Sequence, residues 1–133
     1  MSLILDTSGV LAFVNRHDPD HEAVKSVILE EPGALIVPMG IMAEIGYMLE
    51  QRLGLRALDA FLNDLATGQF TLDCGLEDLP RVQALAHRYS SLPLGFADAV
   101  VIACAERFSK RVLTLDQRHF TVVGREVGLE LLP

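Results

Sequence analysis

Four acidic residues of this sequence stand where a carboxylate could do chemistry: Asp6, Glu44, Asp98 and Asp116. Asp98 is the hardest to explain otherwise, because it lies beside the apolar run of residues 99–105 and has no Lys or Arg within eight positions. A buried carboxylate must find a cation, hydrogen bonds or a proton. Several carboxylates that meet without basic partners are usually held by a hard divalent cation such as Mg²⁺ or Mn²⁺. Metals held in this way activate water against a phosphodiester.

Each acid also has an ordinary explanation when it is taken alone. Asp98 could cap a helix that begins just after it, and Asp6, followed by Thr-Ser, resembles a helix N-cap after a strand. Glu44 could be a solvated glutamate on a helix surface, and Asp116 could start a turn. The four acids form a metal site only if the fold brings their side chains together.

The elements that must position these acids follow from the hydrophobic pattern. Short apolar runs predict strands at residues 2–5, 34–37, 70–72, 111–115 and, weakly, 129–132. Helical spacing predicts helices at 10–15, 21–31, 40–53, 56–66, 79–89 and 96–108, and we expect a short turn at 117–120 followed by Val122 and Val123. This alternation predicts an α/β fold with a parallel sheet of four to five strands and helices on both faces. Ligands of such sheets bind outside the carboxyl ends of the strands, where Asp6 and Asp116 stand.

Composition limits the classes of protein. The 133 residues fit one domain, 1–133, and 50% hydrophobic content with a mean hydropathy of +0.33 predicts a large core. The net charge of −7 opposes nucleic-acid binding through a basic face, unless bound cations offset the carboxylates. Two cysteines do not make a disulfide framework, and the start lacks a basic leader, so we expect a reducing, cytoplasmic location and no membrane span.

Beyond these patterns, the residues around the four acids match a known family. Asp6 stands in Leu-Asp-Thr-Ser, Glu44 in a helix after the second strand, Asp98 in Phe-Ala-Asp-Ala, and Asp116 in Leu-Thr-Leu-Asp with His119 and Phe120 following. The chain resembles a PIN domain, specifically the VapC-type toxins, over essentially its whole length. The segment 92–120 carries the most specific part of the likeness.

The resemblance implies a Mg²⁺- or Mn²⁺-dependent endoribonuclease in which Asp6, Glu44, Asp98 and Asp116 are the metal-site acids. Thr114 and Ser8 match positions where the family often has a hydroxyl near the metal. The resemblance also implies a homodimer and a cognate VapB-type antitoxin whose C-terminal segment occupies the active-site groove. The family's RNA targets include initiator tRNA, other tRNAs and a ribosomal RNA loop, and the sequence does not select one.

Several basic and histidine side chains lie near the acids in the sequence and are candidates for RNA contacts or metal ligands. Arg107, Lys110, Arg111 and Arg118 flank the last acidic position and could contact the RNA backbone, although a solvated helix end explains Arg107 and Lys110 equally well. We interpret His119 as a turn residue, because the neighbouring acids favour an oxygen-preferring metal. The remaining histidines, His17, His21 and His87, show no ligand spacing, and we expect them at the surface.

Three other functions compete with this prediction. A phosphatase would use Asp6 as a covalent nucleophile, but its chemistry commonly needs a second acid two residues on, where this chain has Ser8. A non-catalytic interaction module would keep the fold and use the acids as caps only, and the presence of all four opposes it. A PIN domain that processes RNA outside a toxin system is the third alternative, which sequence alone barely separates from a toxin.

Overall fold

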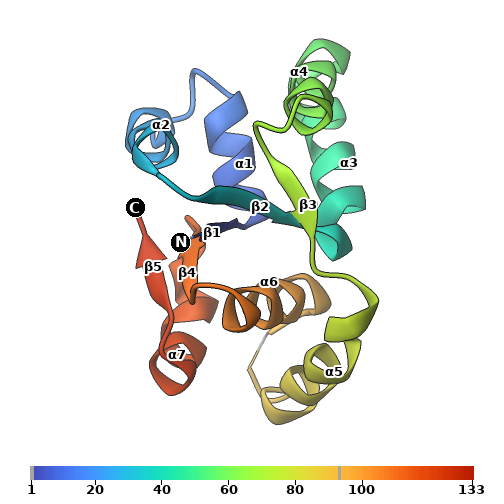
Figure 1. Ribbon diagram of the computed structural model, residues 1–133, viewed down its shortest axis with the longest axis vertical. Coiled ribbons are helices and arrows are strands. Elements are labelled where there is room, and N and C mark those ends of the chain that lie inside the picture. The colour runs from blue at the N-terminus through green and yellow to red at the C-terminus, as the bar shows by residue number, and fades with distance from the viewer. Residues whose placement is uncertain (1, 93) are drawn as a thin grey trace.

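The computed structural model describes residues 2–92 and 94–133, with nothing described of the His119 side chain. Its centre is a parallel sheet of five strands in the order β3-β2-β1-β4-β5 (Figure 1). The strands are β1 (Ser2–Leu5), β2 (Ala34–Pro38), β3 (Thr71–Asp73), β4 (Arg111–Leu113) and β5 (Glu130–Leu132). Parallel pairing sets every carboxyl end at the same edge, so residues that follow β1, β2 and β4 gather there.

Helices cover both faces of this sheet, as the alternating pattern predicts. Figure 1 shows α1 and α2 on one side and α5, α6 and α7 on the other. Helix α3 packs against α1 and pairs with α4. The bounds are α1 (Thr7–Val14), α2 (His21–Glu30), α3 (Met42–Leu53), α4 (Leu55–Ala66), α5 (Leu79–Arg88), α6 (Phe96–Arg107) and α7 (Gln117–Val127), with short 3-10 turns η1 (Met39–Ile41) and η2 (Leu76–Asp78). The predicted α/β class, strand number and layers are confirmed.

The most apolar elements lie at the centre. Leu3, Ile4 and Leu5 of β1 are fully buried, and α6 buries every residue from Ala99 to Ala105. A helix that is apolar on nearly all sides belongs inside a domain, which explains why α6 packs against β1, β2 and β4. Asp98 therefore enters the structure on a helix whose position the core fixes.

The C-terminal prediction was wrong at residues 117–123. Helix α7 replaces the expected turn and the strand-like Val122 and Val123. Phe120 and Val123 are both fully buried while Val122 is exposed, which is a helical and not an alternating pattern. Gly128 then ends the helix with φ of +76°, a conformation that suits glycine.

Two smaller expectations about single residues also fail. The cysteines are paired, with Cys74 and Cys104 joined across Cα atoms 5.5 Å apart, because the segment after β3 folds back onto α6. A separation of 30 residues gives no hint of this contact. His21 is buried, not at the surface, and its Nδ1 lies 2.9 Å from the carbonyl oxygen of Ala12. Within the residues described, no helix is long and apolar enough to cross a bilayer.

Candidate active site

Asp6 is the deepest of the four acids. It follows β1 directly, and its backbone N–H donates to the carbonyl oxygen of Leu113 at 3.0 Å, which extends the β1–β4 pairing by one step. Its side chain is 5% exposed. Asp6 holds the N-cap position of α1 without a capping side-chain hydrogen bond, so capping does not explain this buried carboxylate.

Two hydroxyl groups hold the Asp6 carboxylate. Thr114 Oγ1 donates to Asp6 Oδ2 at 2.8 Å, and Ser8 Oγ donates to the same oxygen at 3.1 Å. Both hydroxyl oxygens also accept backbone bonds, from the N–H of Asp116 to Thr114 at 3.1 Å and from that of Leu115 to Ser8 at 2.9 Å. The network thereby fixes the chain between β4 and α7 against the end of β1.

The protonation of Asp6 reflects this environment. Burial raises the pKa of Asp6 above the usual aspartate value, the hydrogen bonds from Thr114, the Thr7 backbone and Ser8 oppose that rise, and the negative charge of Glu44 adds to it. A cation at this position would offset both the burial and the repulsion.

The other three acids stand at starts of helices. Glu44 lies in the first turn of α3 and is exposed, Asp98 lies in the first turn of α6, and Asp116 is the N-cap residue of α7. Helix α6 begins at Phe96, so the alternative in which Asp98 caps a helix starting after it is wrong. The partial positive charge at a helix N-terminus favours acids there, which lets the fold carry several of them at one edge.

Close backbone packing brings two of these helix starts together. A Cβ on Gly40 of η1 would stand 2.9 Å from Val100 Cγ1, so η1 and the first turns of α6 touch at a glycine. Gly9 similarly meets Leu113, at 3.0 Å for an added Cβ, where α1 crosses the end of β4. Both contacts require a glycine, and the first places η1, which leads into α3 with Glu44, beside α6 with Asp98.

The structure brings some of the predicted site residues together. Asp6, Ser8 and Thr114 are in direct contact, the Asp116 backbone joins them, and Glu44 acts on Asp6 through space. Among residues 2–92 and 94–133, no three His, Cys, Asp or Glu side chains are arranged to hold a metal ion. The four-acid metal site therefore remains a prediction.

Thr7 is a residue that the sequence argument did not select. It is 5% exposed, and in the part of the chain that is described its Oγ1 is the buried side-chain polar atom without a hydrogen-bond partner. Buried hydroxyls normally bond to protein, water or an ion. The signal available in the sequence was only its position beside Asp6.

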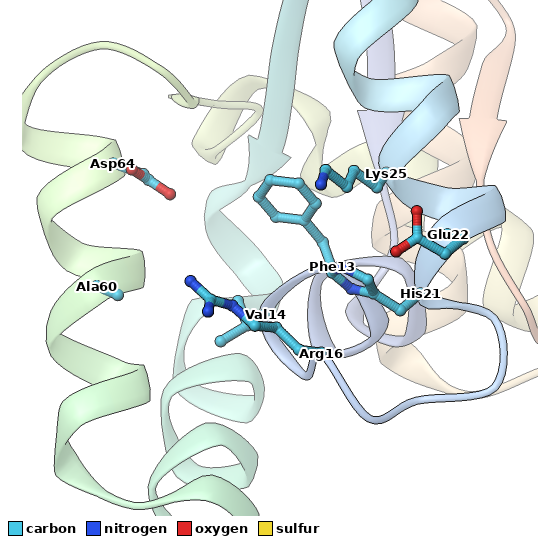
Figure 2. Close-up of a pocket in the computed structure, with 8 residues that line it drawn as sticks. All are labelled: Phe13, Val14, Arg16, His21, Glu22, Lys25, Ala60 and Asp64. Atoms are coloured by element: carbon cyan, nitrogen blue, oxygen red, sulfur yellow. The ribbon is translucent and has the colours of Figure 1, made fainter.

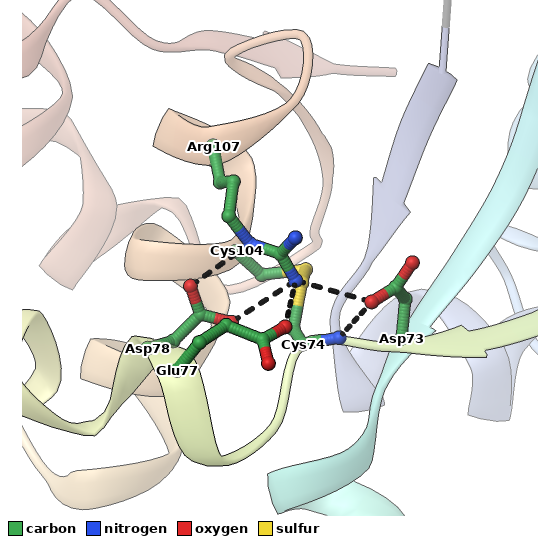
Figure 3. Close-up of a disulfide and its surroundings, with 6 residues drawn as sticks. All are labelled: Asp73, Cys74, Glu77, Asp78, Cys104 and Arg107. Carbon is green, nitrogen blue, oxygen red and sulfur yellow. Dashed lines mark hydrogen bonds and ion pairs between the residues drawn. A yellow bond between two sulfur atoms is a disulfide. The ribbon is translucent and has the colours of Figure 1, made fainter.

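The predicted RNA contacts lie in different surroundings. Arg107 pairs with Asp73, Glu77 and Asp78, as Figure 3 shows. Arg111 pairs with Glu31 at 2.6 Å and begins β4, at the end of the strand opposite Asp6. Lys110 is exposed beside that same opposite end, whereas Arg118 is exposed in the first turn of α7, next to Asp116. Of the four predicted RNA-contacting residues, Arg118 is the closest in sequence to one of the acids, Asp116.

One pocket of the structure lies away from the acids. It has a volume of 470 Å³ and lies between the far end of α1, the start of α2 and α4 (Figure 2). Charged side chains of both signs line it, Arg16 and Lys25 with Glu22 and Asp64, around the ring of Phe13. Because Asp6 is at the opposite end of α1, this cleft is a separate surface.

Comparison with known proteins agrees with the fold. The PIN domain family model matches residues 3–126. Ribonuclease VapC26 of Mycobacterium tuberculosis is 36% identical over 128 residues, which cover 95% of this chain and 94% of the relative. The chain belongs to the PIN domain family, and VapC-type proteins are the relatives it resembles.

Solved structures of similar proteins share the architecture at low sequence identity. M. tuberculosis VapC20, a toxin that cleaves the sarcin-ricin loop, superposes with a TM-score of 0.78 at 19% identity, covering 92% of this chain and 95% of that chain. VapBC2 from Rickettsia felis, bound to a promoter DNA fragment, has a TM-score of 0.73 at 14% identity. The match covers 98% of this chain and 97% of that chain. FitAcB from Neisseria gonorrhoeae has a TM-score of 0.63 at 16% sequence identity. The match covers 98% of this chain and 96% of that chain.

Proposed function

We propose that this protein is a divalent-metal-dependent endoribonuclease and the toxin of a VapBC-type pair. The observation that carries the proposal is the buried Asp6 carboxylate at the carboxyl end of the central strand, oriented by Thr114 and Ser8 and acted on by the negative charge of Glu44. The similarity to a ribonuclease over 95% of the chain supports the same reaction class. Ser8 bonded to Asp6 speaks against the phosphatase alternative, because that position would carry the second acid.

The residues present fit a hard cation. All the side chains proposed to hold it, Asp6, Glu44, Asp98 and Asp116, offer carboxylate oxygens, the donor type that Mg²⁺ and Mn²⁺ prefer. Burial raises the pKa of Asp6, and the neighbouring Thr7 Oγ1 is buried with no hydrogen-bond partner among the described residues; both features support a bound polar ligand here. When bound, such an ion orients the phosphodiester, lowers the pKa of an attacking water and neutralises the leaving oxygen.

The chain's own residues have distinct tasks in this proposal. Asp6 supplies the fixed charge, because two hydroxyls and burial prevent its carboxylate from rotating. Glu44, Asp98 and Asp116 are less buried and sit at helix starts, where side-chain rotation can complete the coordination. Arg118, exposed beside Asp116, is placed to attract the RNA backbone despite the net charge of −7.

Protein partners are part of the proposal. The similarity to the structures of VapBC2 and FitAcB supports a VapB-type antitoxin for this chain. A homodimer is proposed with it from the family resemblance. A small DNA-binding protein encoded directly upstream, which copurifies with this chain and suppresses its cleavage of RNA, is the expected finding.

The test is cleavage of purified cellular RNA with the metal as the variable. We expect cleavage with Mg²⁺ or Mn²⁺, none after chelation by EDTA, and recovery when the metal is restored. Asp6→Asn and Asp98→Asn should each lower the rate of cleavage at least about a hundredfold while the thermal unfolding midpoint stays within a few degrees of the parent. Cleavage by both variants at the parental rate would refute the proposal.

A further inference from the structure

The junction between β3 and η2 is fastened to α6 by a covalent bond. Cys74 follows β3 directly and is 4% exposed, and Cys104 lies in α6 and is fully buried. Cys74 holds φ of +66°, the left-handed region that non-glycine residues rarely adopt. The chain therefore turns sharply at this residue, and the sulfur bond keeps the turn against the helix (Figure 3).

A second, ionic fastening acts on the same junction from one turn further along α6. Arg107 Nη2 lies 3.1 Å from Asp73 Oδ1 and 2.9 Å from Glu77 Oε1. Its Nε lies 3.0 Å from Asp78 Oδ1. Figure 3 shows these contacts surrounding the disulfide. One fastening depends on ionic strength and the other on redox conditions.

The junction also forms a wall of an apolar cavity between η1 and the start of α6. This cavity has a volume of 320 Å³, and its lining includes Cys74 and Gly75 on one side, Met39 and Gly40 of η1 on another, and Phe96 and Val100 of α6. Asp98 lies between Phe96 and Val100 in the chain, and η1 leads directly into α3 with Glu44. Movement of the junction would therefore change the packing around α6, which carries Asp98, and around η1, which precedes α3 with Glu44.

We propose that the Cys74–Cys104 pair is a redox latch that sets the rigidity of the β3–η2 junction and, through it, of the acidic site. A small dithiol or a dithiol protein is the reductant. One of its thiolates attacks the Cys74 sulfur and breaks the bond to Cys104, whose sulfur leaves as a thiolate and takes up a proton. The second thiolate of the reductant then attacks the reductant's own sulfur in the mixed disulfide, which releases the Cys74 thiolate to take up a proton. The products are two protein thiols, each with one proton, and the disulfide of the reductant. In the reduced state Arg107 alone holds the junction.

The sequence makes this latch easy to test, because it contains two cysteines and no other thiol can respond. Alkylation and intact mass would first establish the oxidised and reduced forms. Hydrogen exchange is then measured for residues 73–79, with residues 2–5 of β1 as an internal reference. We expect reduction to accelerate exchange at 73–79 about tenfold and to leave the reference unchanged.

The variant C74S/C104S should exchange like the reduced protein, with or without dithiothreitol. Adding Arg107→Gln should accelerate exchange further in the reduced state and little in the oxidised state. Equal exchange at 73–79 in the two redox forms would overturn the latch, as would two free thiols that persist after oxidation.

The effect on catalysis rests on the proposed function, and we expect RNA cleavage to slow several-fold on reduction. Redox-dependent exchange without cleavage in either form would support the latch and count against the nuclease. Redox-dependent exchange with equal cleavage rates would overturn the link between the latch and the acids.

Discussion

Asp6 and Asp78 are both aspartates with almost no exposure, 5% and 8%, yet the protein accommodates them in opposite ways. Asp78 receives a guanidinium, since Arg107 Nε and Nη2 donate to its two carboxylate oxygens at 3.0 and 3.3 Å. Asp6 receives neutral hydroxyls, and the charged neighbour that acts on it is another acid, Glu44. The charge of Asp78 is therefore neutralised by Arg107 within the fold, whereas the hydroxyl partners of Asp6 leave its negative charge available for a ligand.

The pKa shifts of Asp73, a partner of Arg107, and of Asp6 run in opposite directions. In the Arg107 cluster, the Cys74 backbone N–H and then Arg107 hold the pKa of Asp73 below its usual value, although desolvation opposes them. At the other cluster, burial raises the pKa of Asp6. The comparison teaches that burial by itself does not mark a functional acid; the chemical nature of its partners does.

The largest effect should come from Asp6→Asn, which removes the charge and preserves the shape. We expect RNA cleavage to fall about a hundred- to a thousandfold, in line with several kcal/mol of lost transition-state stabilisation. The thermal unfolding midpoint should stay equal or rise, because a neutral amide costs less to bury than a carboxylate. Initial cleavage rates and calorimetric melting give the two readouts, and a stability loss with unchanged cleavage would reverse the comparison.

Thr114→Val tests the hydroxyl that orients Asp6. Thr114 is fully buried, and valine preserves its volume while removing the donor to Oδ2. We expect a loss of about 10- to 100-fold in metal affinity or cleavage, the usual cost of losing a group that orients a ligand. Thr114→Ser keeps the hydroxyl and should recover most of the activity. Equal defects in the two variants would point to packing and away from orientation.

Asp78→Asn addresses the other cluster. Stability should fall by about 1 kcal/mol, because hydrogen bonds to charged groups contribute about 1.5–3 kcal/mol and Arg107 is partly exposed and keeps two other partners. Cleavage should remain within about twofold of the parent. Urea unfolding measures the loss of stability, and an RNA cleavage assay measures the activity of the same variant. A hundredfold loss of cleavage would contradict the claim that Asp78 serves stability and Asp6 serves catalysis.

The smallest effect is expected at the exposed pair of Arg81 and Glu106, whose nitrogen and oxygen lie 2.8 Å apart. Arg81→Ala should change stability by less than about 1 kcal/mol, as water screens such pairs. A double-mutant cycle with Glu106→Gln measures the coupling. A coupling as large as that of Asp78 with Arg107 would show that burial does not separate the two kinds of ion pair.

The sequence predicted the parallel sheet and the strand-end position of Asp6, because both follow from local apolar runs and from parallel connectivity. It failed at α7, where adjacent β-branched valines resemble a strand until Phe120 and Val123 are seen to share a buried face. The Cys74–Cys104 bond and the role of Arg107 depend on how the junction after β3 folds back, which no short-range pattern encodes. The hydroxyl network was predicted only by family resemblance, since Ser8 and Thr114 lie 106 residues apart.

The most direct test of the account is Mn²⁺ binding followed by electron paramagnetic resonance, which detects the ion without any RNA. The parent should bind Mn²⁺, Mg²⁺ should compete with it, and Asp6→Asn should lose most of the affinity while Asp78→Asn keeps it. Binding that is identical in the parent and in Asp6→Asn would contradict the claim that this buried carboxylate holds a cation.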